Sequence, residues 1–545
     1  MKTEIKLGAF IAAGIALTIA GGWYMRSQPG KISSTATTNK PLRISSDTTF
    51  ETLDSTRYST LTAASTIGNL FDGLYGHNAK GNIIADVSDG APQISKDKRT
   101  YTFHLRHYQW SNGTPLTADD FVYAWQRLAN PAVESRNASR IDILKNGEAV
   151  RMGTKPLSAL GVAATSKYTL KVELASPDPY LFEALSSAPF MPISRKYALA
   201  QGKLYGSDAN HILTNGPFTI QKWTGNNDKH WQLVKNKRYY FKRNVQLSQI
   251  DFSVDGNSSN AATRFTQQKL DYTAIDADSV PKYLGNRKLH RMTTTSCAYL
   301  IFNTTAGPTK NVHLRHAIAT AFDKHLFAAG TLQNGAKALN GIVPTNLARS
   351  STGADFRATG GSLLEFDTAY ALKQWHLAQR ELGTSHMTVT LNIANTSDAK
   401  LAGNFLKGQI EHNLPGLKIA LQATDLEKRV ALETAGNYQM VFSTWTPADV
   451  DPYNLLSFYL TDSRLNISGY SNAKYDQMLR AINQLGDQPQ KRWRQELAAE
   501  KYLLTVDAPM AGVYQAGLAY LLTDRVETFP VLPNGIINYE YVRLH

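Results

Sequence analysis

Two aspartates, Asp449 and Asp451, follow a tryptophan, Trp445, in a short segment that ends at Pro452. A carboxylate that is taken out of water needs a partner, and a positively charged group of a ligand supplies one together with hydrogen bonds. Asp449 has an alternative role, because an aspartate often caps the turn that follows it. Trp445 either forms the wall of a pocket or packs in a core. The segment therefore holds candidate binding residues, each with a structural alternative.

The elements before this segment predict where it lies. Apolar residues alternate in three stretches with helices between them, in the order strand 387–393, helix 397–414, strand 417–421, helix 426–435 and strand 439–444. This β-α-β-α-β spacing indicates a parallel sheet with right-handed crossovers. Ligands of such open sheets bind beyond the carboxyl ends of the strands. The topology therefore predicts a ligand site at the loop from Trp445 to Pro452.

The sequence contains no familiar catalytic or metal-binding motif. The patterns GxSxG, HExxH, GxxxxGK[ST] and CxxC are absent. His313 and His316 lie one helical turn apart without a third ligand nearby, so solvated helix residues are expected there. The single cysteine, Cys297, rules out an internal disulfide and a cysteine-based metal cage. We therefore expect no enzyme activity, no metal and no cofactor.

The composition is that of a folded, basic protein. The chain has 545 residues, of which 42% are hydrophobic and 10% aromatic, and this length suggests two or three domains. The formal net charge is +14, and removing residues 1–25, which carry +1, leaves +13. Such a charge suits anionic surroundings such as a cell wall or lipid headgroups. The basic and aromatic segment 235–244 is interpreted as an exposed strand end with its turn, so no nucleic-acid partner is expected.

The N-terminal segment indicates export. Lys2 and Lys6 precede an apolar run from Leu7 to Tyr24. Residues 1–25 are either a cleaved signal peptide or an uncleaved anchor, since roughly 18 apolar residues are near the lower limit for crossing a bilayer. Residues 26–40 are rich in Ser, Thr, Gln and Pro and predict a flexible linker. The membrane is therefore an expected partner through this segment.

The segment from Arg99 to Leu128 predicts a strand, a turn and a helix. Thr117 is the expected N-cap of the helix, with Asp119 and Asp120 near the positive end of the helix dipole. The apolar residues of the strand are Tyr101, Phe103 and Leu105, and those of the helix face are Phe121, Trp125 and Leu128.

The string RTYTFHLRHYQWSNGTPLTADDFVYAWQRL of this segment resembles the signature region of the extracellular solute-binding proteins, family 5, the oligopeptide-binding family of peptide ABC importers. Similar strings follow in matching order at residues 157–185, 212–223 and 466–479. The resemblance implies an α/β, two-lobed fold of the periplasmic-binding-protein type (type II), with an additional small subdomain and a discontinuous first lobe. It also implies a surface-tethered monomer that captures extended oligopeptides between its lobes and delivers them to an ABC permease.

The resemblance implies boundaries for these parts. The first lobe is expected to comprise residues 41–75, 212–296 and 516–545, the inserted subdomain residues 76–211, and the second lobe residues 297–515. Asn215 and Gly216 resemble the hinge where the chain returns to the first lobe, with a plain tight turn as the alternative. Gly22 stands where lipidated relatives carry a cysteine, so a cysteine-linked lipid anchor is excluded.

The resemblance also assigns the pocket residues. In that family, a carboxylate just after the loop tryptophan captures the N-terminal ammonium of the peptide. An alignment without gaps from Trp445 to Pro452 places this carboxylate on Ala448. An insertion after Trp445 places it on Asp449, which is the first choice, with Asp451 as the second. Other pocket positions carry different residue types from a well-studied member, and Lys400 can still pair with a carboxylate. This chain has Thr49 where that member has a glutamate, Asn137 where it has a tyrosine, Lys400 where it has a histidine, Leu426 where it has a tryptophan and Phe442 where it has an arginine. Phe50 is also assigned to the pocket.

Two alternatives to this function stay open. One is the same fold binding another solute or a signalling peptide. The other is an adhesin that attaches to anionic polymers through its cationic surface, which salt would weaken.

Overall fold

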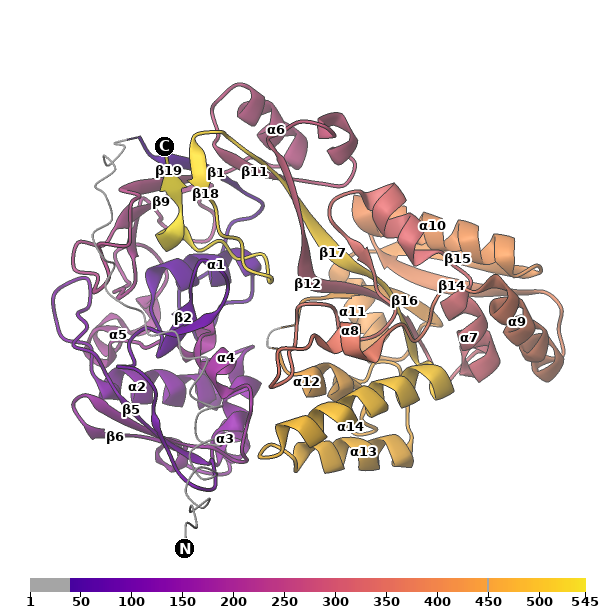
Figure 1. The fold of residues 1–545 in the computed structure, drawn as a ribbon, viewed down its shortest axis with the longest axis horizontal. Helices are drawn as coiled ribbons and strands as arrows, with labels where there is room; N and C mark the ends of the chain where they lie inside the picture. Colours follow the sequence, from indigo (N-terminus) through magenta and orange to yellow (C-terminus); the bar gives the residue numbers. More distant parts are fainter. Residues whose placement is uncertain (1–39, 448–449) are drawn as a thin grey trace, which may run out of the picture.

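Figure 1 shows the computed structural model of the protein, which describes residues 40–447 and 450–545. The predicted leader, most of the predicted linker and Asp449 lie outside the described residues. None of the described helices is long and apolar enough to cross a membrane. Two bodies lie side by side, and the long strands β12 (Leu289–Phe302) and β17 (Met510–Leu522) run from one to the other (Figure 1).

One large sheet continues through both bodies. β12 and β17 pair antiparallel over most of their length, with a register shift between Thr293 and Cys297. The strand order is β15 (Leu417–Thr424), β14 (Met387–Ala394), β16 (Met440–Trp445), β12, β17, β11 (Tyr272–Ile275), β1 (Leu42–Ser46), β10 (Gln249–Val254), β9 (His230–Lys235) and β8 (Phe218–Gln221), and β13 (Lys337–Ala338) also pairs with β17.

The apolar side chains form two large cores that are separate from each other. One contains residues from 42 to 272 and from 520 to 544, and the part of the chain around it is here called the first lobe. The other contains residues from 277 to 514, and its part is called the second lobe. A small third cluster surrounds α6 (Ser258–Thr266). Each lobe therefore buries its own apolar surface, as a separate domain does.

The second lobe confirms the predicted β-α-β-α-β unit. β14 pairs parallel with β15 and with β16, and α10 (Ser397–Asn413) and α11 (Leu426–Thr434) are the connections. The other helices of this lobe are α7 (Val312–Thr320), α8 (Phe356–Gly360), α9 (Thr368–Leu382), α12 (Pro452–Leu456), α13 (Ala473–Asn483) and α14 (Pro489–Tyr502).

The first lobe joins distant parts of the chain. β1, near the start, lies between β10 and β11 and is parallel to both. The C-terminal strands β18 (Val526–Thr528) and β19 (Arg543–Leu544) lie beside them in Figure 1. The other elements here are α1 (Leu61–Leu70) and the hairpin of β2 (Tyr75–His77) and β3 (Ile83–Ala85).

A second, four-stranded sheet packs on the same core. Its order is β4 (Gln93–Ile94), β5 (Thr100–His104), β7 (Thr169–Glu173) and β6 (Val162–Ser166). The helices beside it are α2 (Ala118–Ala129), α3 (Gly147–Arg151), α4 (Leu181–Leu185) and α5 (Arg195–Gln201).

The strand and the helix predicted between Arg99 and Leu128 are confirmed as β5 and α2. Thr117 is the N-cap of α2 as predicted, and Asp120 in addition accepts a hydrogen bond from the backbone N–H of Thr117 at 2.9 Å. The six apolar side chains assigned to the strand and the helix face are all buried.

Candidate ligand-binding site

A cleft of about 1780 Å³ separates the two lobes and is lined by both. This volume exceeds the roughly 300–1,000 Å³ of a pocket for one small molecule, so the cleft suits an elongated ligand. The first lobe contributes the turn after β2, the segment before and within α4, and the turn around Asn534. The second lobe contributes Leu347, the loop after β16 and the start of α14.

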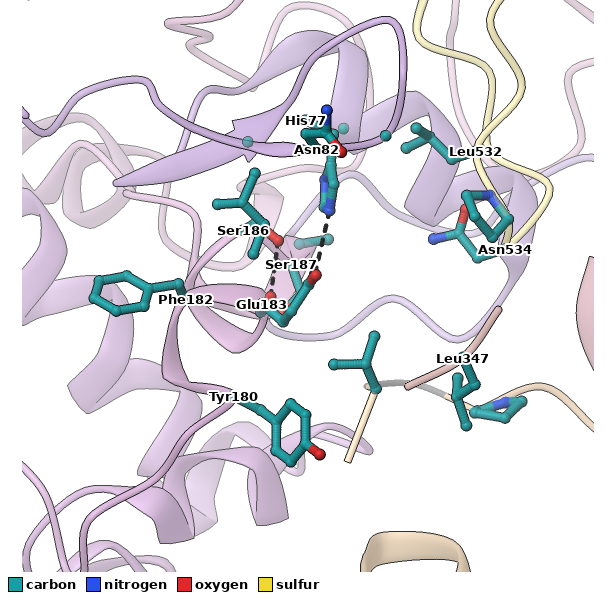
Figure 2. A pocket seen from close by; sticks show the side chains of 18 of the residues that line it. His77, Asn82, Tyr180, Phe182, Glu183, Ser186, Ser187, Leu347, Leu532 and Asn534 are labelled. Carbon is teal, nitrogen blue, oxygen red and sulfur yellow. Dashed lines mark hydrogen bonds and ion pairs between the residues drawn. The ribbon is translucent and has the colours of Figure 1, made fainter. Parts of the chain in front are cut away.

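His77 and Glu183 form the middle of the first-lobe wall (Figure 2). His77 ends β2 and Glu183 lies on α4, and the imidazole Nε2 is 3.2 Å from the carboxylate Oε2. Their side chains are 23% and 28% exposed, so both are within reach of a ligand. A half-buried carboxylate with a histidine as its partner can accept a further hydrogen bond from a ligand.

Two serines extend this wall (Figure 2). The Ser186 hydroxyl donates to the carbonyl oxygen of Glu183 at 2.8 Å, and the Ser187 hydroxyl donates to that of Ala184 at 2.6 Å. Each hydroxyl has thus used its single donor and keeps its capacity to accept. The wall therefore presents mainly acceptors, which suits N–H groups of a ligand.

Arg492 on α14 lies where the two lobes come together. Its Nη2 is 2.5 Å from Oδ2 of Asp451, and its Nε is 3.0 Å from Oε1 of Glu496. Its guanidinium lies 5.7 Å from the ring of Tyr453 and also 5.7 Å from the ring of Tyr180, which belongs to the first lobe. The arginine is therefore shared between the lobes.

The carboxyl groups beside Arg492 are strongly perturbed. Burial raises the pKa of Asp451 and of Glu496, and neighbouring carboxylates raise it further while Arg492 opposes the shift. Glu496 is fully buried beside Asp451, and a side-chain hydrogen bond with Asp451 also raises its pKa. This corner of the cleft therefore binds protons more readily than ordinary carboxyl groups do.

The exposed charged side chains that line the described part of the cleft are basic. They are Lys80, Lys96, Lys98 and Arg349. By contrast, Asp72 is buried at the cleft floor, where it accepts hydrogen bonds from the hydroxyls of Tyr108 and Tyr239 at 2.8 and 3.0 Å. The cleft therefore attracts anionic groups of a ligand to its rim.

The predicted binding loop lies at the cleft. Asp449 itself is outside the described residues, but Thr446, Pro447 and Val450 line the cleft. Trp445 is 41% exposed and meets the ring of Phe458 edge-on at 5.1 Å, so it is not packed in the core. Asp451 caps α12 by accepting from the backbone N–H of Tyr453 at 2.9 Å, in addition to its pair with Arg492.

The other predicted pocket residues are spread over the structure. Asn137 lines the cleft and donates to the carbonyl oxygen of Tyr58 at 3.0 Å. Phe50 is buried in the first core, stacked on Trp223 with ring centroids 4.6 Å apart. Phe442 is 2% exposed in the second core.

Three more predicted residues lie outside the described cleft lining. Lys400 is exposed in the first turn of α10, and Thr49 is half-buried after β1. The side chain of Leu426 lies outside the described residues. The structure thus brings Asn137 and the loop after Trp445 to one cleft, and the peptide-binding roles of all these residues stay predictions.

Asn215 and Gly216 form hydrogen bonds within the first lobe, to the end of α1 and to Asn236 after β9. The Asn215 side chain donates to the carbonyl oxygen of Asp72 at 2.8 Å, and the Gly216 N–H donates to that of Leu70 at 2.9 Å. A Cβ on Gly216 would lie 2.7 Å from the backbone nitrogen of Phe71, so this close approach requires glycine. The hinge role of the two residues stays a prediction.

Sequence reasoning missed His77, Tyr180, Glu183 and Arg492. They come from separate segments, and no spacing motif connects them. The i,i+4 pair Arg492–Glu496 was a visible signal, but such pairs usually lie on solvent-exposed helix faces.

Among the described residues, no group of three or more His, Cys, Asp or Glu side chains is arranged to hold a metal ion.

Comparison with known proteins identifies the family. The middle region of the bacterial extracellular solute-binding proteins, family 5, matches residues 82–466. The chain is 29% identical over 465 residues to the dipeptide-binding protein of Lactococcus lactis subsp. cremoris, covering 82% of this chain and 84% of the relative. It is 25% identical over 488 residues to the probable deoxycholate-binding periplasmic protein YgiS of Escherichia coli, covering 88% and 89%.

A solved structure agrees with this result. The OppA protein of Listeria monocytogenes bound to peptide superposes with a TM-score of 0.78 at 31% sequence identity, covering 92% of this chain and 98% of that one. The two-lobed α/β fold of the periplasmic-binding-protein type is thereby confirmed. With a family match over most of its length, the chain belongs to the bacterial extracellular solute-binding proteins, family 5.

Proposed function

We propose that this protein binds oligopeptides in the cleft between its lobes and delivers them to an ABC permease. The observation that carries the proposal is the cleft of about 1780 Å³, walled by both lobes of a chain that is 31% identical to an OppA protein bound to peptide. The dipeptide-binding relative supports peptides as the class of ligand. The chain acts as a binder in this proposal and catalyses no reaction.

Peptide capture uses three features of the cleft. Asp449, in the loop that follows β16, pairs with the N-terminal ammonium of the peptide. The acceptors of Glu183, Ser186 and Ser187 receive N–H groups of the ligand. The basic rim attracts the C-terminal carboxylate or acidic side chains. Backbone hydrogen bonds to an extended peptide, as in strand addition, explain how one cleft can accept several sequences.

The division of the chain is part of the proposal. In this division the first lobe in the narrow sense comprises residues 41–75, 212–296 and 516–545, and the second lobe comprises residues 297–515. The inserted subdomain, residues 76–211, shares the core of the first lobe and carries His77, Tyr180 and Glu183. The separate cores support the division between the lobes, and the four-stranded sheet supports the subdomain.

The protein is further proposed to be exported and held at the outer face of the cytoplasmic membrane by residues 1–25, as a monomer. Mass spectrometry of the native protein should find an intact N-terminus if this segment is an anchor. A chain that starts at or near Gly21 would instead show a secreted form.

One other ligand class has specific support. The probable deoxycholate-binding protein, which is similar to this chain, is named for a ligand that is not a peptide. A steroid acid has a rigid apolar body, whereas the first-lobe wall described above is polar. The acceptors of Glu183, Ser186 and Ser187 favour the N–H groups of a peptide over the ring system of a steroid acid.

The test is to identify what the protein carries. Protein purified from its native source is denatured, and the released ligand is identified by mass spectrometry. Calorimetry then measures the affinity for that ligand at low and high salt. Peptides should be released and should bind with micromolar or tighter affinity at both salt concentrations. Release of a bile acid, or salt-labile binding to anionic polymers with no peptide affinity, would contradict the proposal.

A further inference from the structure

The two lobes touch at one corner of the cleft, where a glycine of the second lobe packs so closely against the first lobe that no side chain would fit in its place. Gly486, between α13 and α14, lies against Pro177 of the first lobe, and a Cβ added to it would be 1.6 Å from the Pro177 carbonyl oxygen. The φ angle of Gly486 is not in the left-handed region, so its backbone accepts other residues. Only the packing of the opposite lobe therefore requires glycine here.

Two further contacts join the lobes at the same corner. The ammonium of Lys98 donates to the carbonyl oxygen of Asp487 at 3.3 Å. Tyr180, three residues after Pro177, places its ring 5.7 Å from the guanidinium of Arg492. A cation over an aromatic face is attracted to it, and the attraction grows when water is excluded. All three contacts are between protein groups and need no ligand.

Arg492 connects this corner to the predicted binding loop. On its second-lobe side it pairs with Asp451, and Asp451 caps the first turn of α12. Asp451 directly follows Val450, which lines the cleft together with Thr446 and Pro447. The guanidinium thus contacts the opposite lobe on one side and the end of the binding loop on the other.

We propose that Arg492 is a positioning residue of the ligand cleft: closure of the lobes brings it against Tyr180, and through Asp451 it then holds Val450 and the first turn of α12 in place at the cleft. This inference rests on the proposed function, since Val450 lines the cleft that is proposed to hold the peptide. The contact itself favours closure whatever the ligand is.

The charges at this corner link closure to pH. The groups that face Arg492 are Asp178 and Tyr180 from the first lobe, Asp451 and Tyr453 from α12, and Glu496 from α14. Three carboxyl groups thus share one guanidinium. Burial raises the pKa of Asp451 and of Glu496, so the closed form keeps a proton that open, hydrated carboxyl groups would release. Closure is therefore favoured at low pH and weakens as the pH rises.

The first experiment separates closure from folding. Gly486→Ala adds a methyl group that the first lobe cannot accommodate, and Gly408→Ala is the matched control, because a Cβ at this exposed position of α10 meets no atom within 4 Å. We expect Gly486→Ala to bind peptide about ten- to a hundredfold more weakly, the usual effect of overpacking. Its radius of gyration at saturating peptide should exceed that of the wild type, and its thermal unfolding should be unchanged. Gly408→Ala should match the wild type in affinity and radius.

The outcome that overturns the proposal is a Gly486→Ala protein that is as compact as the wild type and binds as tightly. The radii of the ligand-free proteins are compared as well. If the wild type binds no peptide, the proposed function fails, while a larger ligand-free radius for Gly486→Ala still supports the closing contact. An equal ligand-free radius in that case would overturn it.

The second experiment tests positioning through the pH profile. Peptide affinity is measured from about pH 6 to about pH 9, where carboxyl groups with raised pKa values titrate. We expect the wild type to bind more weakly as the pH rises, and Glu496→Gln, which keeps the shape without the charge, to lose most of this dependence. A Glu496→Gln profile equal to that of the wild type would contradict the proposal. The Arg492→Met variant should bind peptide more weakly than the wild type. The Arg492→Lys variant should bind peptide more tightly than Arg492→Met and more weakly than the wild type.

Discussion

The imidazole Nε2 of His77 lies 3.2 Å from the carboxylate Oε2 of Glu183, and this contact joins the hairpin of β2 and β3 to helix α4 across the wall of the ligand cleft. The second oxygen of Glu183 and the two serine hydroxyls after it have acceptor capacity left for a ligand. A basic peptide side chain that enters here meets a carboxylate in a site from which much of the water is excluded.

Glu183→Gln should therefore change which peptides bind. For a peptide with lysine or arginine at the position that faces this wall, we expect affinity to fall by roughly 1.5–3 kcal/mol, the usual value of a hydrogen bond to a charged group. The same peptide with alanine there should bind unchanged. Calorimetry on a peptide series that varies one position at a time measures both values. Glu527→Gln, an exposed carboxylate of β18, is the control, and equal losses for all peptides would contradict the prediction.

The two aspartates of the binding loop should respond differently to substitution. Asp449→Asn should weaken a native peptide by roughly 2–5 kcal/mol, because the buried ammonium loses its charged partner. Asp451 already pairs with Arg492, so Asp451→Asn should lower the free energy of unfolding by roughly 1.5–3 kcal/mol. Calorimetry and denaturant unfolding of both variants separate the two effects. Unchanged affinity for Asp449→Asn, with Asp451→Asn unable to bind, would reassign the ammonium site to Asp451.

Local patterns predicted much of the fold. The alternation in β14, β15 and β16 and the caps of α2 depend on residues within a few positions of each other, and the structure confirms them. The parallel order followed from the length of the helical connections. The loop after Trp445 was placed at the cleft by the same argument.

Contacts between distant segments were not visible in the sequence. Phe50 was assigned to the pocket, yet it stacks on Trp223 in the first core, and the chain gives no local signal for that pairing. Arg492 and Glu496 form an ordinary helical pair by spacing. The guanidinium of Arg492 lies 5.7 Å from the rings of both Tyr180 and Tyr453, and Tyr180 comes from the other lobe. A site made between two lobes depends on tertiary contacts that periodicity does not encode.

Lys324 should make stability depend on pH. Its side chain is 1% exposed and its ammonium donates to the carbonyl oxygen of Leu364, and burial lowers its pKa from 10.5 to about 7. Between these values the unfolded chain holds a proton that the folded protein does not, so the free energy of unfolding rises with pH. We expect the free energy of unfolding of the wild type, relative to that of Lys324→Met, to rise by up to about 1.4 kcal/mol per pH unit in this range. Urea unfolding at a series of pH values measures the difference, and a pH-independent difference would show that the lysine is charged in the fold.

The buried pair of Arg357 and Glu500 should be a main support of the second lobe. Glu500 is fully buried, and its Oε1 accepts from the guanidinium of Arg357 at 2.6 Å and from the backbone N–H groups of Ile342 and Val343 at 2.8 and 3.0 Å. Glu500→Ala leaves a buried cation and two donors without this acceptor, so we expect a loss of roughly 3–5 kcal/mol in the free energy of unfolding.

Glu500→Gln keeps an acceptor for these donors, so its free energy of unfolding should fall by less than that of Glu500→Ala. The comparison separates the effect of the hydrogen bonds from that of the charge. Arg287→Ala removes an ion pair to Asp524 whose side chains are 80% and 51% exposed, and it should change stability by no more than about 1 kcal/mol. Denaturant unfolding compares the three variants. Because Glu500 lies on α14, two turns after Arg492, a destabilised Glu500→Ala protein should also lose affinity for peptide, whereas Arg287→Ala should not. Equal effects of Glu500→Ala and Arg287→Ala on stability would show that burial adds nothing to the Arg357–Glu500 pair.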